Sequence, residues 1–184
     1  MSEREILIQH YKSPCGTLLL GTLYDQLCLC DWADRPDRQR IDRRIQHGLR
    51  AHYVSGRSLT HLFAEAQLTE YFSGKRSRFS VPLLQVGTPF QRIVWNQLLF
   101  QPYGTTLSYS KLASLVSSDA AIRAVSSAVG ANALSIFIPC HRIVGKNHDL
   151  VNYAGGLEAK YYLLNMEIYM SVHSTFEADY CSSE

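Results

Sequence analysis

Short apolar stretches dominate the first 32 residues of the chain. Residues 5–11, 17–23 and 27–32 alternate or run apolar, which is the pattern of β-strands. Tyr24-Asp-Gln26 separates the last two stretches and supplies the polar residues of a turn. We therefore expect a β-hairpin or a three-stranded meander at the start of the chain.

The pattern changes over residues 35–86. The stretch 35–50 contains six arginines with little apolar periodicity, so we expect a loop or an exposed helix rather than a core element. Apolar residues then recur near helical spacing from Leu59 to Phe72 and stop at Ser73-Gly74. A short strand over 79–83 would complete an N-terminal unit that ends at residue 86.

The second half of the chain reads as helices. Thr88 is a good N-cap followed by a proline, and Ser108 is a good N-cap for a second, short helix. Ser117 and Ser118 open a third helix, which Gly130 ends. The predicted helices cover 88–98, 108–116 and 119–129. The last two have the proportions of a helix-turn-helix.

The third of these helices carries unusually small side chains. Alanines, serines and a glycine occupy most of residues 120–131, so its backbone could approach another molecule closely. Tight packing against another helix explains such a surface equally well. Arg123 is the exception, because a long cation on a smooth helix could enter a narrow nucleic-acid groove, where the negative potential is concentrated.

Composition and charge restrict the class of protein. The 184 residues are 46% hydrophobic, enough for one domain or two small ones. The first residues include acids, and no apolar run is long enough to cross a membrane, so we expect a soluble intracellular protein. Residues 88–145 carry a net charge of +3 and residues 146–184 a net charge of −4. A basic middle suits a protein that presents one face to phosphates.

The five cysteines form no CxxC pair, which argues against a disulfide framework. Cys28 and Cys30 would share a strand face, but without a second pair nearby a zinc site is not expected. Cys140 differs from the rest, because His141 and Arg142 follow it within the apolar stretch 136–145. Neighbouring cations lower the pKa of a thiol and make it a nucleophile, although most cysteines among Ile, Phe and Val are inert core residues.

The motifs around Cys140 decide between these readings. The chain resembles the O6-alkylguanine-DNA alkyltransferases, which are the methylated-DNA–protein-cysteine methyltransferases of direct DNA repair. The C-terminal half carries the resemblance strongly, and the first 87 residues carry it only loosely. The matching segments are Pro139-Cys-His-Arg142, Asn152-Tyr-Ala-Gly-Gly-Leu157, Thr88-Pro-Phe-Gln-Arg-Ile-Val-Trp95, Pro102-Tyr-Gly104, Ser108-Tyr109, Arg123-Ala-Val125, Asn132 and Glu167.

The resemblance implies a fold and a domain order. It implies an α/β N-terminal domain with a small antiparallel sheet (residues 1–86), followed by a mostly helical C-terminal domain with a helix-turn-helix (residues 87–170). Residues 171–184 match nothing and are expected to be a flexible tail. Ala133 and Ser135 stand where the family often has prolines, and Ser126 stands where a glycine is common, so the pocket wall and the helix surface depart from the family pattern.

The resemblance also implies roles for individual residues. The helix enters the minor groove, Arg123 fills the gap left by a flipped nucleotide, and Tyr109 crowds the phosphate and promotes the rotation. Asn132 ties the helix to the cysteine segment. The helix is expected to make further contacts to DNA through Ala121, Ala124 and Ser127. The expected substrate pocket consists of Ser135, before the cysteine, and of Tyr153, Ala154, Gly155 and Gly156, after it.

Adjacent side chains diverge on a helix and point apart on a strand, so His141 is expected to serve Cys140 through a bridging water. Leu157, Tyr161, Leu164 and Ile168 mark an apolar stripe on the last helix, which Glu167 borders. A carboxylate there could orient the imidazole and favour its charged form.

We therefore expect the irreversible transfer of an alkyl group from O6-alkylguanine, and from O4-alkylthymine, in duplex DNA to Cys140. Each molecule would act once, after base flipping, as a monomer without cofactor, metal or membrane partner. The expected location is the cytoplasm with access to a bacterial nucleoid, or the nucleus of a eukaryote. A DNA-damage sensor would lack Cys140, and a cysteine hydrolase would turn over.

Overall fold

The computed structural model describes residues 4–117 and 121–181, with side chains as far as His173. The last helix is the longest element. In chain order the elements are β1 (Arg4–Ser13), β2 (Gly16–Leu23), β3 (Gln26–Trp32), α1 (Arg38–Leu49), β4 (Ala51–Ser55), α2 (Leu59–Phe72), α3 (Pro89–Leu98), β5 (Leu107–Ser108), α4 (Tyr109–Val116), α5 (Ile122–Gly130), the 3₁₀ turn η1 (Cys140–Arg142), β6 (Ile143–Val144) and α6 (Gly156–Cys181).

The main sheet is mixed, with strand order β3-β2-β1-β4. The predicted meander is confirmed, because β1, β2 and β3 pair antiparallel. The expectation of a wholly antiparallel sheet is wrong, since β4 pairs parallel to β1 after the crossover through α1. The strand expected over 79–83 is reduced to a single bridge between Leu27 and Leu83.

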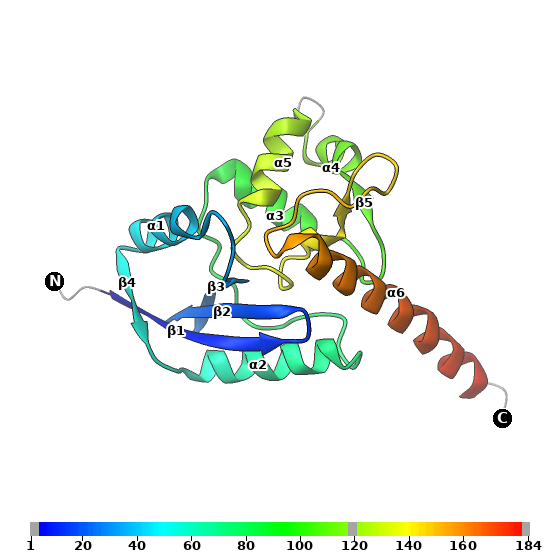
Figure 1. Ribbon diagram of the computed structural model, residues 1–184, viewed down its shortest axis with the longest axis horizontal. Coiled ribbons are helices and arrows are strands. Elements are labelled where there is room, and N and C mark those ends of the chain that lie inside the picture. The colour runs from blue at the N-terminus through cyan, green and yellow to red at the C-terminus, as the bar shows by residue number, and fades with distance from the viewer. Residues whose placement is uncertain (1–3, 118–120, 182–184) are drawn as a thin grey trace.

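Helices cover both faces of this sheet (Figure 1). Leu18 and Leu20 of β2 belong to the cluster that includes α2, whereas Leu19, between them, packs in the cluster that includes α1. Successive side chains on a strand point to opposite faces, so β2 must be apolar throughout. The sequence predicted a loop or an exposed helix at 35–50, but Ile41 and Ile45 bury α1 against the sheet.

The helical second half begins as the N-caps predict. Thr88 accepts from the backbone N–H of Gln91, whose side chain in turn accepts from the N–H of Thr88, and Ser108 accepts from the N–H of Lys111. The next helix starts later than expected, because α5 begins at Ile122 without a side-chain cap. Ser118 and Asp119, where we placed its start, lie outside the described residues.

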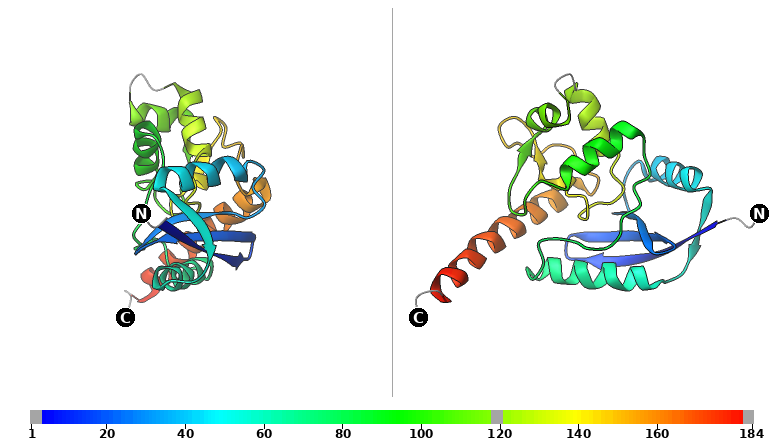
Figure 2. Two further views of the ribbon diagram at one scale, coloured as in Figure 1. Left: turned by 90° about the vertical axis from the view of Figure 1, so that its left-hand side faces the viewer. Right: turned by 180° about the vertical axis from the view of Figure 1, so that it is seen from behind.

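Helix α6 runs from the body of the protein and projects well beyond it (Figures 1 and 2). The apolar stripe predicted on this helix has the wrong phase, because Leu157, Tyr161 and Ile168 are exposed. Leu164 of the predicted stripe is buried, and the buried face otherwise carries Ala159, Lys160, Leu163 and Glu167. Residues 171–181, expected in a flexible tail, continue the helix. Among the described residues, no helix is both long and apolar enough to cross a membrane.

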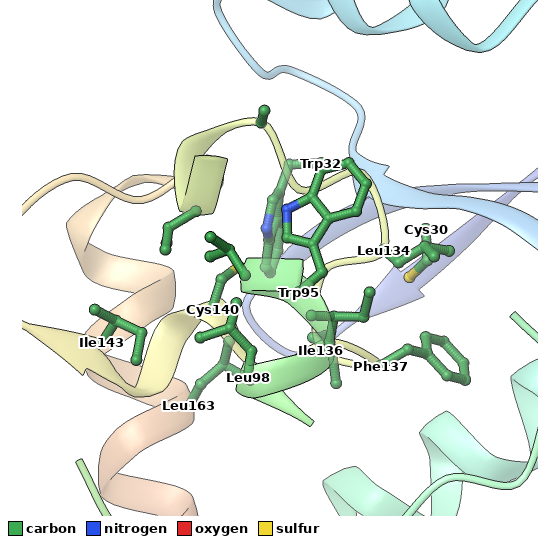
Figure 3. Close-up of a cluster of buried hydrophobic side chains, with 14 of the residues drawn as sticks. Cys30, Trp32, Trp95, Leu98, Leu134, Ile136, Phe137, Cys140, Ile143 and Leu163 are labelled. Carbon is green, nitrogen blue, oxygen red and sulfur yellow. The ribbon is translucent and has the colours of Figure 1, made fainter. Parts of the chain in front are cut away.

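One hydrophobic cluster joins the sheet to the helices of the second half. It contains Trp32 from β3, Trp95 from α3, Cys140 from η1 and Leu163 from α6. These four residues lie together in Figure 3. The two halves therefore share a core, and a boundary at residues 86–87 stays a prediction. Cys140 sits inside this shared core, where its neighbours come from both halves of the chain.

Candidate active site

The edge strand β3 holds the segment that leads to Cys140. Cys30 N–H donates to Ala133 O at 2.9 Å, and Ser135 N–H donates to Cys30 O at 2.7 Å. Ile136 follows with φ of 73°, in the left-handed region that β-branched residues rarely adopt. Such a conformation costs on the order of 1–3 kcal/mol and persists only where neighbours over-determine it. The pairing with β3 supplies that restraint, so Cys140 is presented by a rigid segment.

Cys140 is buried, with 5% of its surface exposed. Asn132 Nδ2 donates to the Cys140 sulfur at 3.1 Å and to Ile138 O at 3.0 Å. Burial raises the pKa of Cys140 above that of an ordinary thiol, and the Asn132 hydrogen bond and the charges of Lys160 and Arg35 partly oppose this. The resting group is therefore a thiol, and it needs a proton acceptor before it can act as a nucleophile.

His141 is fully buried, and its Nε2 lies 2.8 Å from Oε1 of Glu167. The predicted pairing of these two residues is present, and burial opposes the charged form of the ring that is expected from the sequence. Burial lowers the pKa of His141 below its ordinary value of 6.5, although Glu167 acts in the opposite direction. The ring is neutral at neutral pH, with Nε2–H donating to the carboxylate and Nδ1 carrying a lone pair.

Four hydrogen bonds from three other residues explain why Glu167 does not charge His141. Arg142 donates from Nε and from a terminal nitrogen at 2.9 Å each, Tyr71 donates its hydroxyl at 2.6 Å, and Gly104 donates its N–H at 3.1 Å. Burial alone would raise the pKa of Glu167, but His141 and Arg142 together hold it well below its ordinary value. The negative charge is thus already neutralised by Arg142, and Glu167 serves His141 as an orienting acceptor.

The Nδ1 atom of His141 is buried and has no hydrogen-bond partner among the described residues. No direct hydrogen bond joins His141 to Cys140, because adjacent residues of the 3₁₀ turn η1 direct their side chains apart. An unpaired buried acceptor costs about 1–3 kcal/mol. The buried Nδ1 of His141 is therefore an acceptor that remains available to a small polar molecule.

Sequence reasoning missed Lys160, whose side chain is fully buried. Its ammonium donates to Ile143 O at 2.6 Å and to Val151 O at 2.7 Å, and so joins β6 to the loop that follows. Burial lowers the pKa of Lys160 to about 8, and Cys140 acts in the opposite direction. The spacing could have revealed this residue, since Lys160 lies two helical turns before Glu167 on the same face.

A groove of about 700 Å³ lies between three parts of the chain. Its walls come from α4 and α5, from the loop after β6, and from the connection between β3 and α1. The predicted site residues in its walls are Tyr109, Arg123, Ser127, Tyr153 and Ala154, joined by Arg35, Pro36, Asp37, Ile122, Ser126, Gly130 and Asn152.

Some predicted site residues lie elsewhere. Ala121 and Ala124 are exposed around the start of α5 but do not line the groove. Ser135, expected in the pocket wall, is fully buried and donates its hydroxyl to Asp31 at 3.3 Å. It therefore faces the sheet. Gly156 begins α6 with φ of 81°, so its conformation suffices to explain the glycine.

Gly155 is required by packing on the N-terminal half. A Cβ at this position would meet the indole ring of Trp32 at 2.3 Å. Trp32 also stacks edge-on to Tyr153, with the ring centroids 5.8 Å apart. The wall of the groove thus rests on a side chain from β3, a contact that no local sequence motif announces.

Tyr109 and Tyr153 line the groove, and the charge of Cys140 acts on both hydroxyls. Burial raises the pKa of Tyr109 to about 12, and Cys140 contributes in the same direction. Burial likewise raises the pKa of Tyr153, and the charge of Cys140 raises it further. Both tyrosines therefore lie close enough to Cys140 for its charge to raise their pKa values. In the described part of the chain, no group of three or more His, Cys, Asp or Glu residues could hold a metal ion.

A buried thiol with an amide donor, beside an oriented imidazole, is the arrangement of a cysteine nucleophile. Comparisons with known proteins specify the family. Residues 89–168 match the family model described as the 6-O-methylguanine DNA methyltransferase, DNA binding domain. The chain is 37% identical over 158 residues to the methylated-DNA–protein-cysteine methyltransferase of Mycobacterium leprae, covering 84% of this chain and 88% of that relative.

The inducible methyltransferase of Bacillus subtilis is 50% identical over 101 residues, which is 55% of this chain. That alignment spans only about half of the relative, 56% of its length. A crystal structure of an O6-methylguanine methyltransferase from Mycobacterium tuberculosis superposes with a TM-score of 0.74 at 32% identity, covering 90% of this chain and 94% of that one. A second M. tuberculosis structure, in complex with DNA, gives 0.74 at 31% identity over the same shares.

The chain belongs to the methylated-DNA–protein-cysteine methyltransferase family. Its DNA-binding domain lies in the helical half that contains Cys140. The resemblance recognised from the sequence motifs is thereby confirmed.

Proposed function

We propose that this protein repairs DNA by moving the alkyl group of O6-alkylguanine in duplex DNA to the sulfur of Cys140, once for each protein molecule. The observation that carries the proposal is the arrangement around the thiol. Asn132 Nδ2 lies 3.1 Å from the sulfur, and the neighbouring His141 is held by Glu167 with its Nδ1 unpaired. A thiol in such a setting can lose its proton to the imidazole without a direct contact.

The transfer is an in-line displacement. A water between His141 Nδ1 and Cys140 passes the thiol proton to the neutral imidazole, and the thiolate then attacks the alkyl carbon. The S–C bond forms as the C–O6 bond breaks, and the electron pair leaves with guanine. Guanine takes up one proton, which balances the proton lost from Cys140. The product is a thioether, and the protein has no means of reversing it, so a molecule that has reacted is spent.

The reaction requires the alkylated base to leave the duplex, because O6 is otherwise enclosed in the helix. Helices α4 and α5 form a helix-turn-helix in this proposal, and α5 enters the minor groove. Arg123 on α5 lines the groove of the protein together with Tyr109 and Tyr153. Arg123 occupies the space of the flipped nucleotide, and Tyr109 crowds its phosphate. O4-alkylthymine presents a similar alkyl-oxygen edge and is proposed as a second substrate.

The alternatives differ in stoichiometry. A damage sensor needs no thiol, and the built environment of Cys140 argues against that role. A cysteine hydrolase would release product repeatedly. Mixing the protein with an excess of duplex DNA that contains O6-methylguanine should yield at most one repaired base per protein molecule. Repair of many bases by each molecule would contradict the proposal.

A further inference from the structure

A single guanidinium from the N-terminal half reaches both the end of α5 and the backbone of Asn132. Arg35 lies between β3 and α1 and is 5% exposed. One terminal nitrogen donates to Asn132 O at 3.0 Å and to Asp31 Oδ2 at 3.0 Å. The other donates to Gly130 O. The side chain therefore bridges carbonyls on either side of Ala131.

Asp31 keeps this guanidinium in place. Its carboxylate is fully buried at the end of β3 and also accepts from Trp32 N–H at 3.0 Å and from Ser135 Oγ at 3.3 Å. Arg38 lies 3.6 Å from the same carboxylate. Buried ions need such partners, and a fork with fixed donor directions holds its acceptors in one geometry. The buried Asp31 carboxylate therefore restrains the position of the Arg35 guanidinium.

The two carbonyls that Arg35 holds belong to residues with different tasks. Gly130 is the last residue of α5, the helix that carries Arg123. The carbonyls at a helix end lack partners within the helix and carry partial negative charge, so a guanidinium suits them. Asn132 is the residue whose side chain donates to the Cys140 sulfur. Arg35 therefore contacts the end of the helix that carries Arg123 and the backbone of the residue whose side chain holds the thiol.

We propose that Arg35 is a positioning residue of the transfer site, which keeps the end of α5 and the Asn132 amide in register with Cys140. This inference rests on the proposed function. Under this inference, the N-terminal half contributes a residue that positions the transfer site. The charge of Arg35 acts in the same sense, because it lowers the pKa of Cys140 while Asp31 raises it.

The test compares Arg35→Met and Arg35→Lys with a matched control, Arg44→Met. Arg44 is also an arginine of the N-terminal half, and it donates to Ala131 O at 2.7 Å, the carbonyl between the two that Arg35 holds. It makes no contact with Asp31 or Asn132 among the described hydrogen bonds and ion pairs. The control therefore measures the effect of losing a bond between the halves at the same loop.

Two readouts separate positioning from stability. The first is the single-turnover rate with free O6-benzylguanine base, which needs no DNA binding. The second is the rate of Cys140 alkylation by iodoacetamide against pH, followed by peptide mass spectrometry. Arg35→Met should slow base transfer about 10-fold or more, on the scale of one lost charged hydrogen bond. It should also move the iodoacetamide profile to higher pH, whereas Arg44→Met should change neither while lowering the melting temperature.

Arg35→Lys keeps the charge but not the fork, so it should retain the pH profile and still slow base transfer several-fold. This variant carries the comparison if Arg35→Met does not fold. A wild-type transfer rate in folded Arg35→Lys, or equal losses in Arg35→Met and Arg44→Met, overturns the inference. Failure of the wild-type protein to accept an alkyl group would instead remove the proposed function, and the iodoacetamide profile would still report on Arg35.

Discussion

The imidazole of His141 meets Glu167 through Nε2 at 2.8 Å, and this contact leaves Nδ1 of the same ring without a partner in the described part of the protein. The contact fixes which nitrogen carries the hydrogen. Because burial keeps the ring neutral, the free Nδ1 is a proton acceptor. The contact with Glu167 therefore holds His141 as a neutral base rather than as an imidazolium.

Glu167→Gln should change the acid sensitivity of the protein. His141 and Arg142 hold the folded-state pKa of Glu167 well below its ordinary value of 4.5. A carboxyl with a depressed pKa stabilises the fold fully above its unfolded-state pKa, and this stabilisation is lost as the pH falls through the folded-state value. Near neutral pH the variant should be about 3–5 kcal/mol less stable, because Arg142 loses its buried partner.

The measurement is urea unfolding of both proteins from neutral pH to about pH 3. The difference in the free energy of unfolding should be constant above about pH 5 and should narrow as the pH falls below 4.5. Parallel curves over the whole range would mean that Glu167 is not held ionised by its partners.

Lys160→Met tests the buried ammonium beside the nucleophile. The variant leaves the carbonyls of Ile143 and Val151 without their donor, which should lower the free energy of unfolding by roughly 2–4 kcal/mol. It also removes a positive charge that lowers the pKa of Cys140, so transfer to free base should slow at neutral pH. Lys146→Met, at an exposed lysine of the same loop, serves as the control.

The pH dependence distinguishes charge from packing. Lys160 has a pKa of about 8 in the folded protein, so its positive charge is present below that pH and fades above it. The ratio of wild-type to Lys160→Met rates should be largest below about pH 8 and should narrow above it. A ratio independent of pH would assign Lys160 to packing alone.

Three residues at the site show how far the sequence motifs predict its geometry. Cys140, Asn132 and His141 were predicted from a motif, and the structure brings them together as expected. The charge state of His141 was not predictable, because the partners of Glu167 include Tyr71 and Gly104, which lie far from it in sequence. Burial depends on such distant contacts, and burial decides the protonation state.

The last helix shows a second limit. Leu157, Tyr161 and Ile168 form a credible apolar stripe, yet the buried face includes Lys160 and Glu167. Hydrophobic periodicity assigns the inner face from apolar residues alone. Buried ions paired across the site reverse that assignment, and a functional site is where such reversals are expected. The sequence pattern predicts no strand at β4, because its five residues show no strict alternation of apolar and polar side chains.

Arg123→Ala should impair repair of duplex DNA far more than reaction with free base. Arg123 is exposed on α5 in the groove wall, and only the duplex reaction requires a flipped nucleotide. Holding a base out of the stack costs a few kcal/mol, so the duplex rate should fall on the order of 10- to 100-fold. Arg92→Ala, at an exposed arginine of α3 outside the groove, should leave both rates unchanged. Equal losses on both substrates would place Arg123 in the fold or the pocket.

Gly155→Ala should displace the wall of the groove. The added Cβ would lie 2.3 Å from the Trp32 ring, so the loop or the indole must move, at a cost of about 1–3 kcal/mol. Transfer to free base should slow, because Tyr153 moves with the loop. Gly130→Ala is the matched control for stability, because its Cβ would meet nothing within 4 Å and the substitution should leave the free energy of unfolding unchanged or slightly higher. Thermal unfolding and transfer rates of both variants check this, and a wild-type Gly155→Ala protein would contradict it.

Transfer to Cys140 is tested most directly by intact-protein and peptide mass spectrometry after mixing with duplex DNA that contains O6-methylguanine. The wild-type protein should gain one methyl group in place of one hydrogen, located on the Cys140 peptide, with one guanine restored for each methylated protein. Cys140→Ala should bind the same DNA and gain nothing. A methyl group on another residue, or transfer by the folded Cys140→Ala protein, would contradict the account.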